Sequence, residues 1–178
     1  MHFHETPLLG AFVIDLDKLS DERGFFGRSY CPREFAQHGI EMRVVQCNVS
    51  YNARRGTLRG MHFQVAPKAE PKLVRCTRGA IFDVIVDLRP ESPTHGRWFG
   101  VELSAVNHRQ LYIPDGLAHG FVTLADDSEV FYQMGEFFSA EHARGVRWND
   151  PAFDIRWPIE PTVISTKDQS YPDYKPLE

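Results

Sequence analysis

The sequence predicts an all-β protein, an antiparallel sandwich or barrel with a few short helices. The first observation is a series of short segments rich in β-branched and aromatic residues, which recur at regular spacing after residue 43. The second is that clusters of turn-forming residues separate these segments, at 78–79, 90–96, 114–116 and 126–127. Such alternation of short strands and turns is typical of sandwiches and barrels.

The elements follow in order along the chain. Residues 8–16 predict a strand interrupted by Gly10, and residues 21–28 predict a loop. Residues 32–38 predict a short helix, because Pro32 suits a first helical turn and Gly39 follows as a stop. The later strands are expected at residues 43–51, 73–76, 80–88, 98–103, 110–113, 120–124 and 129–134.

The segment after Ser139 changes character. Residues 140–144 predict a helical turn, and residues 148–158 predict an irregular segment whose two tryptophans pack on the sheet. No linker, low-complexity tract or repeat interrupts the chain, so residues 1–178 are expected to form a single domain.

Composition excludes several classes of function. The 24 acidic and 20 basic residues give a net charge of −4 without a basic block, which argues against a nucleic-acid partner. The N-terminus lacks the pattern of a signal peptide, and no apolar run is long enough to span a membrane. The three cysteines, Cys31, Cys47 and Cys76, show no CxxC spacing, so a reducing cytoplasmic setting is expected.

Residues 58–64, LRGMHFQ, combine several chemistries in one stretch. Arg59 offers a planar set of donors for phosphate or carboxylate, and His62 can act as a base or an acid near neutral pH. In a regular strand these two side chains would lie on opposite faces, unless a bulge at Gly60 redirects one of them. A surface arginine and a hydrogen-bonded core histidine form the alternative interpretation.

Residues 113–121, IPDGLAHGF, resemble the second motif of the cupin barrels, in which the histidine, here His119, usually binds a metal. The first cupin motif supplies a His-x-His pair, but this chain has His62 followed by Gln64 at the second position. Gln is a poor ligand for transition metals, and Glu70 lies in a proline-rich loop. We therefore expect a metal-free barrel mouth, with a metal site as the alternative.

An ordered set of motifs from about residue 7 to residue 168 resembles the dTDP-4-dehydrorhamnose 3,5-epimerases, also described as dTDP-4-keto-6-deoxyglucose 3,5-epimerases. Any one motif is weak, but the ordered set is specific. The motifs are DERGFF (21–26), QCN (46–48), LRGMHFQ (58–64), PKLV (71–74), GAIFDV (79–84), IPDGLAHGF (113–121), VFY (130–132), WNDP (148–151) and STKD (165–168).

The resemblance implies a cupin or jelly-roll homodimer that epimerises C3 and C5 of a nucleotide-linked 4-keto-6-deoxyhexose, in dTDP-rhamnose and polysaccharide biosynthesis. It implies no cofactor and no metal. His62 matches the base, Asp168 the carboxylate that orients it, and Tyr132 the acid. Lys72 and His119 match groups near the ketone oxygen, where negative charge develops.

The remaining matched positions bind the nucleotide. Arg23 and Arg59 match contacts to the diphosphate, and Phe26, Gln46 and Asn48 match the nucleoside region, partly reached from the neighbouring subunit. Taken alone, each of these residues reads as an ordinary surface or core side chain. Asp83 is expected to support the site from a neighbouring strand.

Two positions depart from the family pattern. Arg28 stands where the family commonly has a carboxylate that accepts the thymine N–H, and a guanidinium can only donate. Cytidine and guanosine carriers therefore stay open beside thymidine. Phe138, after Phe137, stands where the family often has a hydroxyl-bearing aromatic, which is expected to leave Tyr132 as the only phenol at the site.

Two other functions remain as alternatives to an epimerase acting on C3, C5 or both. One is a 3,4-ketoisomerase of a nucleotide-linked keto sugar on the same barrel. The other is a non-catalytic cupin that binds a sugar nucleotide or a metal.

Overall fold

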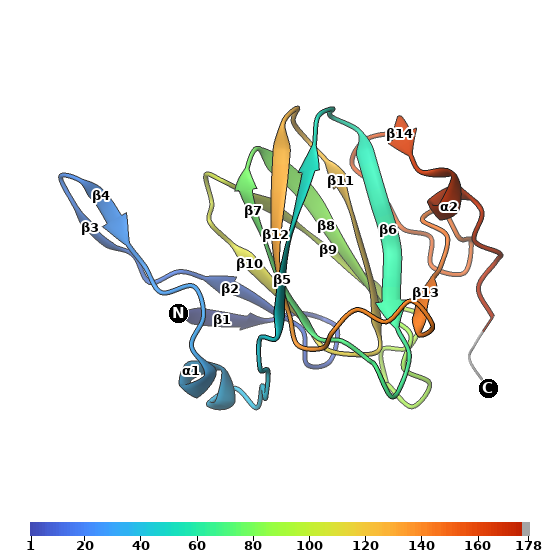
Figure 1. The fold of residues 1–178 in the computed structure, drawn as a ribbon, viewed down its shortest axis with the longest axis horizontal. Coiled ribbons are helices and arrows are strands. Elements are labelled where there is room, and N and C mark those ends of the chain that lie inside the picture. The colour runs from blue at the N-terminus through green and yellow to red at the C-terminus, as the bar shows by residue number, and fades with distance from the viewer. Residues whose placement is uncertain (176–178) are drawn as a thin grey trace.

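The computed structural model describes residues 1–175 and contains two facing antiparallel sheets (Figure 1). The first sheet has six strands in the order β1-β2-β10-β7-β12-β5. Their bounds are β1 (His2–Glu5), β2 (Phe12–Asp15), β10 (Gln110–Ile113), β7 (Lys72–Arg78), β12 (Ser128–Met134) and β5 (Gln46–Asn52). These strands and the second sheet confirm the predicted all-β class.

The second sheet has the order β13-β6-β11-β8-β9, and β14 pairs in parallel with β6 along the same edge as β13. Its strands are β13 (Ala143–Gly145), β6 (Thr57–Gln64), β11 (Leu117–Thr123), β8 (Ala80–Asp87), β9 (Trp98–Ser104) and β14 (Val163–Ile164). Two short helices complete the fold, α1 (Pro32–Ala36) and α2 (Thr166–Gln169). Among residues 1–175, no helix is both long and apolar enough to cross a membrane.

The main core lies between the two sheets. Val74 and Val130 of the first sheet and Ile85, Leu103 and Phe121 of the second belong to one buried cluster. Each contributes roughly 1.5–3 kcal/mol through the removal of apolar surface from water. The core therefore occupies one part of the space between the sheets, and the cavity described below occupies another.

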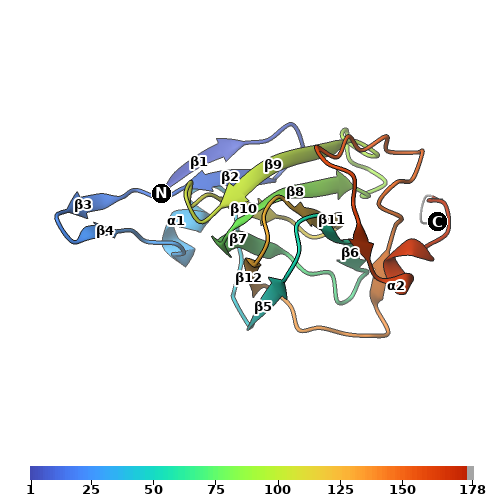
Figure 2. The same cartoon turned by 90° about the horizontal axis from the view of Figure 1, so that it is seen from above.

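Several boundaries differ from the sequence predictions for physical reasons. Residues 21–28 are not simply a loop, because β3 (Leu19–Asp21) and β4 (Gly24–Phe26) form a hairpin. All six of its strand residues are exposed, so no apolar periodicity marks it in the sequence. Figures 1 and 2 both show this hairpin extending away from the two sheets.

Three further elements were predicted incorrectly in detail. The predicted strand at 8–16 starts only at Phe12, and it pairs with β1, a largely polar strand that the pattern missed. Residues 140–142 form a turn, but residues 143–145 continue as β13 on the edge of β6. Helix α1 ends at Ala36, two residues before the predicted end.

A β-bulge in β6 decides which way its side chains point. His62 pairs with His119 and Arg59 pairs with Phe121, so three steps along β6 match two steps along β11. The extra residue lies at Gly60, whose φ is 146°, and a Cβ there would lie 2.6 Å from Cα of Gly120. Because paired residues share a face, Arg59 and His62 lie on the same face, as only the bulged arrangement allows.

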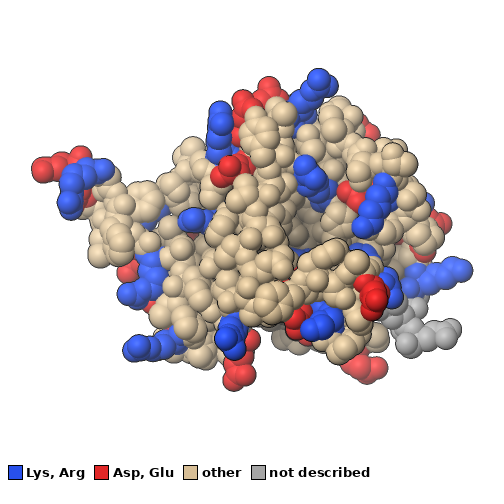
Figure 3. All heavy atoms as spheres, in the orientation of Figure 1, with Lys and Arg blue, Asp and Glu red and all other residues tan. Residues whose placement is uncertain are grey.

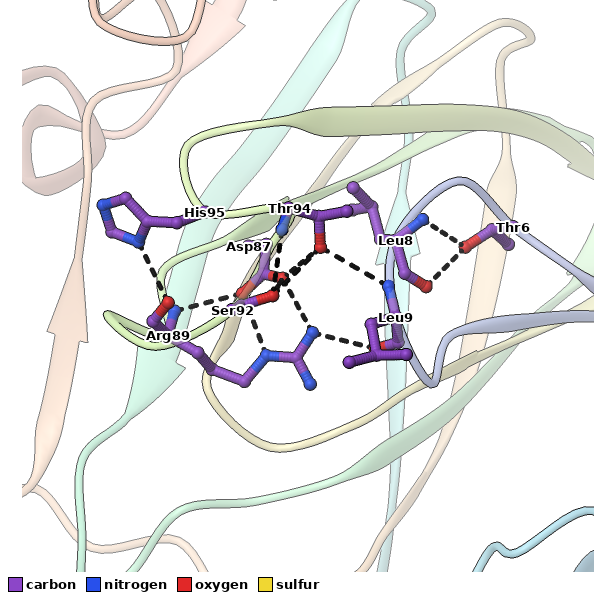
Figure 4. A network of polar contacts seen from close by, with 8 residues as sticks. All are labelled: Thr6, Leu8, Leu9, Asp87, Arg89, Ser92, Thr94 and His95. Atoms are coloured by element: carbon purple, nitrogen blue, oxygen red, sulfur yellow. Dashed lines mark hydrogen bonds and ion pairs between the residues drawn. The ribbon is translucent and has the colours of Figure 1, made fainter.

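A buried carboxylate ties the end of β8 to the turn between β1 and β2 (Figure 4). Asp87 accepts hydrogen bonds from Arg89 Nη2 at 2.7 Å and from the hydroxyls of Ser92 and Thr94, each at 2.6 Å. Arg89 also donates to the carbonyl of Leu9 at 2.8 Å. Burial alone would raise the pKa of Asp87, but these donors outweigh burial and lower the pKa to about 2.

We expect Asp87→Asn to destabilise the fold at pH 7 by about 2 kcal/mol, the free energy that corresponds to the lowered pKa. The Asp87 contribution is complete above the unfolded pKa of about 3.8 and disappears as the pH falls through about 2. Urea unfolding at pH 7 and at pH 2 measures both effects. Asp15→Asn, which removes exposed surface ion pairs, is the matched control, with an expected cost of about 0.5 kcal/mol or less. Equal stabilities of the Asp87→Asn and wild-type proteins at pH 7 would contradict this account.

Candidate active site

A cavity of about 650 Å³ opens between the two sheets, in the range of small-molecule sites. Strands β5, β7 and β12 of the first sheet form one wall, and β6 and β11 of the second sheet form the other. The segment from β14 to Tyr171 closes one side. Among the predicted site residues, His62, Lys72, His119, Tyr132, Asp168, Arg59, Asn48 and Phe138 line it.

His62 and Asp168 form a hydrogen-bonded pair in this cavity although they lie far apart in the sequence. Strand β14 runs parallel to the start of β6, and Ser165 then caps α2 by accepting the backbone N–H of Asp168 at 3.1 Å. Asp168 Oδ1 lies 2.7 Å from His62 Nε2, and its Oδ2 accepts the N–H of Gly60 at 3.3 Å. The short helix thus delivers the carboxylate to β6.

The charge state of this pair follows from its surroundings. Burial would raise the pKa of Asp168, but the hydrogen bond and charge interaction with His62, together with the Gly60 and Ser165 contacts, lower the pKa below its ordinary value. An ionised Asp168 requires His62 Nε2 to donate, so the neutral imidazole has its free lone pair at Nδ1. His62 can therefore act as a base through Nδ1.

Tyr132 lies on the opposite wall, on β12, next to a second histidine–carboxylate pair. His119 Nε2 lies 2.7 Å from Asp83 Oδ1, and the Tyr132 and His119 rings meet edge to face at 6.0 Å. Burial, with the negative charge of Asp83, raises the pKa of Tyr132 well above its ordinary value. The Tyr132 phenol consequently stays protonated at neutral pH and can donate a proton.

Lys72 is a buried residue of the cavity and not a surface lysine. Its ammonium lies 3.1 Å from Glu70 Oε1 and donates to the carbonyl of His62 at 3.3 Å. Both side chains are less than a tenth exposed. Glu70, considered above only as a metal ligand, therefore neutralises Lys72.

The residues expected to bind the nucleotide divide into two groups, and the first lies at the cavity. Arg59 lines it and donates to Asn52 Oδ1 at 2.8 Å, which fixes the guanidinium. Gln46 donates to Asn48 Oδ1 at 3.2 Å and accepts the N–H of Phe138 at 3.4 Å. Gln46 thus supports two cavity residues without lining the cavity itself.

The second group lies outside the cavity of its own chain. Arg23 and Phe26 belong to the projecting β3–β4 hairpin, whose tip carries the charged side chains visible in Figure 3. Arg28 follows the hairpin and forms an ion pair with Glu34 at 2.6 Å. The structure therefore does not bring these three residues together with His62 within one chain.

Gln64, at the position of a cupin metal ligand, is committed to backbone groups. Its amide nitrogen donates to the carbonyls of Lys68 at 2.8 Å and Phe137 at 3.2 Å, and its oxygen accepts the N–H of Ser139 at 2.6 Å. It thereby holds the loop that carries Phe138. Within residues 1–175, no cluster of three or more His, Cys, Asp or Glu side chains could hold a metal ion.

Lys167 and Tyr171 are among the cavity residues that the sequence analysis did not identify as site residues. Lys167 directly precedes Asp168, and its place in the STKD motif could have indicated it. Tyr171 lines the cavity beside His62, and no local pattern pointed to it. The expectation that Tyr132 is the only phenol at the site was therefore wrong.

Comparison with known proteins identifies the family of this chain. Residues 5–176 match the family model described as dTDP-4-dehydrorhamnose 3,5-epimerase. The protein of that name from Sinorhizobium fredii is 46% identical over 97% of this chain and 89% of its own length.

Solved structures of similar proteins have the same fold as this chain. The Bacillus anthracis enzyme of the same name, crystallised with TDP and PPi, has a TM-score of 0.93 and 46% identity, and covers 97% of this chain and 99% of its own. The Legionella pneumophila dTDP-6-deoxy-D-glucose-3,5-epimerase, in complex with dTDP-4-keto-L-rhamnose, has a TM-score of 0.87 and 37% identity over 94% and 89% of the two chains. These likenesses confirm the predicted cupin-type fold. Since the matches in sequence and in structure span nearly the whole chain, this protein belongs to the dTDP-4-dehydrorhamnose 3,5-epimerase family.

Proposed function

We propose that this protein is an isomerase that inverts C3 and C5 of dTDP-4-dehydro-6-deoxyglucose by proton abstraction and reprotonation. The observation that carries the proposal is the placement of a base and an acid on opposite walls of one cavity. His62 with Asp168 lies on one sheet and Tyr132 on the other. The relatives crystallised with TDP and with dTDP-4-keto-L-rhamnose support the substrate class.

The first step removes a proton from a carbon next to the C4 ketone. Nδ1 of His62 takes the proton, and Asp168 stabilises the resulting imidazolium. The electron pair of the broken C–H bond forms a double bond to C4, and the π electrons of the ketone move onto the C4 oxygen. The product is an enolate. Lys72 and His119, both at the cavity wall, stabilise that developing negative charge.

The second step returns a proton to the opposite face of the same carbon. The Tyr132 hydroxyl donates it, and the enolate electrons form the new C–H bond while the ketone is restored. Its raised pKa makes the phenol a donor that keeps its proton until a basic enolate is present. Each centre exchanges one proton for another, so no hydride or electron leaves the substrate and the chemistry requires no cofactor.

Deuterated solvent tests this mechanism directly. Incubation of the 4-keto sugar nucleotide in D₂O should place deuterium at both C3 and C5, measured by NMR and mass spectrometry. His62→Ala should reduce this exchange by about 10³-fold or more, because the base is lost. His4→Ala, at an exposed histidine of β1, is the matched control and should exchange normally.

A second variant tests the role of Tyr132 as the acid separately from the role of His62 as the base. Tyr132→Phe should retain part of the exchange but lose inversion, since abstraction survives and reprotonation on the opposite face does not. Deuterium at one carbon only would limit the reaction to one centre, and a shifted carbonyl would indicate the ketoisomerase. No incorporation at all would indicate a binding protein and refute the proposal.

The nucleobase is proposed to be thymine despite Arg28. The guanidinium of Arg28 is engaged by Glu34, which also accepts a hydrogen bond from the N-terminal ammonium of Met1. A paired guanidinium is less available to select a base that presents acceptors. The relative crystallised with TDP supports thymidine.

A panel of nucleoside diphosphates checks this specificity. Calorimetric titration should show TDP binding at least about ten-fold more tightly than CDP or GDP, a difference of about 1.4 kcal/mol. ADP serves as a control for binding through the diphosphate alone. Tighter binding of CDP or GDP than of TDP would instead assign the specificity to Arg28.

The active form is proposed to be a homodimer in which each hairpin reaches the partner's cavity. Leu19 and Phe26 of the hairpin are 68% and 73% exposed, an unusual cost for a monomer in water. A two-fold dimer would cover these side chains and bring Arg23 and Phe26 to the second cavity. This arrangement accounts for the distance between Arg23 and its own cavity.

Mixing two inactive variants tests the exchange. Arg23→Ala and His62→Ala should each form inactive dimers, because each lacks one component of every site. After co-refolding, half of the dimers are mixed, and one site in each contains both His62 and the partner's Arg23. About a quarter of the wild-type activity should return, whereas no recovery would place Arg23 and His62 in the same chain.

A further inference from the structure

We propose that Tyr171 is a positioning residue whose ring, together with Asp168, holds the His62 imidazole in the orientation needed for proton abstraction. The inference deepens the proposed function, because it rests on His62 being the base. It concerns a residue that neither the motifs nor the mechanism above uses.

Tyr171 lies beside His62 on the side that the tail closes. Its ring meets the imidazole edge to face, with ring centroids 6.2 Å apart and an interplanar angle of 66°. Tyr171 is half-buried and lines the cavity. It follows Asp168 by three residues across the end of α2, so one turn of chain brings both the carboxylate and the aromatic ring to His62.

Gly145 provides the space that this ring occupies. On β13, Gly145 pairs directly with His62 of β6. A Cβ on Gly145 would lie 2.2 Å from Cζ and 2.6 Å from the hydroxyl oxygen of Tyr171. Since Gly145 has no left-handed φ, the Tyr171 ring is what forbids a side chain there. Gly145, which lies opposite His62, and Tyr171, which fills the space beside Gly145, therefore form one structural unit.

The His62 imidazole needs a second contact, in addition to Asp168, to fix its orientation. The side chain of His62 is 43% exposed, and its hydrogen bond to Asp168 fixes only the Nε2 end of the ring. If the imidazole rotated about its hydrogen bond to Asp168, Nδ1 would turn away from the substrate. The Tyr171 ring blocks this rotation on one side. A displacement of about 1 Å in a reacting group can cost about 10²-fold in rate.

The packing also explains why an aromatic ring suits this place. Burial and the negative charge of Asp168 both raise the pKa of Tyr171, so the phenol stays neutral beside the carboxylate. A neutral ring excludes water from the His62–Asp168 pair without competing for the carboxylate. The proposed positioning role therefore belongs to the aromatic ring of Tyr171 and not to its hydroxyl group.

A double-mutant cycle with Gly145 tests the inference. Tyr171→Ala should lower kcat by about 10- to 100-fold and change KM by less than about three-fold, because the nucleotide contacts are untouched. Tyr171→Phe should recover most of the lost rate. Gly145→Ala should resemble Tyr171→Ala, because its methyl group displaces the ring.

The combined variant G145A/Y171A decides whether the two positions act as a unit. It should be no slower than Y171A alone, because the added methyl group then meets empty space. Additive losses, or a Y171F variant as slow as Y171A, would overturn the inference. Thermal unfolding of each variant confirms that the chain is folded when kinetics are compared.

A measurement independent of turnover keeps this inference separate from the proposed function. Diethyl pyrocarbonate should modify His62 several-fold faster in Y171A than in the wild-type protein, as judged by mass spectrometry of the His62 peptide. An inactive H62A beside a Y171A with wild-type kinetics and modification rate would overturn only the role of Tyr171. A fully active H62A would overturn the proposed role of the base itself.

Discussion

The close approach of Gly60 and Gly120 is the constraint on which the site depends. Neither position can carry a side chain, because a Cβ on Gly120 would lie 2.8 Å from the carbonyl oxygen of Arg59 and 2.7 Å from Sδ of Met61. The bulge that these two glycines permit turns Arg59 onto the face of His62. A regular strand would separate the proposed diphosphate contact from the proposed base by the thickness of the sheet. One cavity contains both because β6 is irregular at this point.

The second constraint on the site lies at the edge of β6, where other segments pair and orient His62. Strands β13 and β14 both lie along this edge, and each brings a segment remote in sequence to the same histidine. The parallel pairing of β14 sets the position of α2 and hence of Asp168, while β13 supplies the bare Gly145 that accommodates Tyr171. The proposed base is therefore oriented by segments that follow the central strands of the sheet in the sequence.

The sequence allowed most of the fold to be predicted, but only part of the site. Strands β8, β10 and β12 could be predicted from their β-branched and aromatic residues, which fit a buried pleated surface. The exposed β3–β4 hairpin has no such pattern, and the bulge at Gly60 depends on a register that no local pattern encodes. Asp168 could be identified only through resemblance, and Tyr171 lies outside every quoted motif.

The distribution of charge in the cavity suits the proposed substrate, which joins a charged nucleotide to a neutral sugar. Three basic groups of the cavity each have a carboxylate within hydrogen-bond distance, which is Asp168 for His62, Asp83 for His119 and Glu70 for Lys72. Arg59 instead is held by the neutral amide of Asn52, so its positive charge is uncompensated by that partner. We therefore expect the diphosphate of the proposed substrate to be attracted to Arg59, while the sugar ring would meet groups whose charges are balanced until an enolate forms. In the proposed complex, this difference in partners would direct the diphosphate and the sugar to their places.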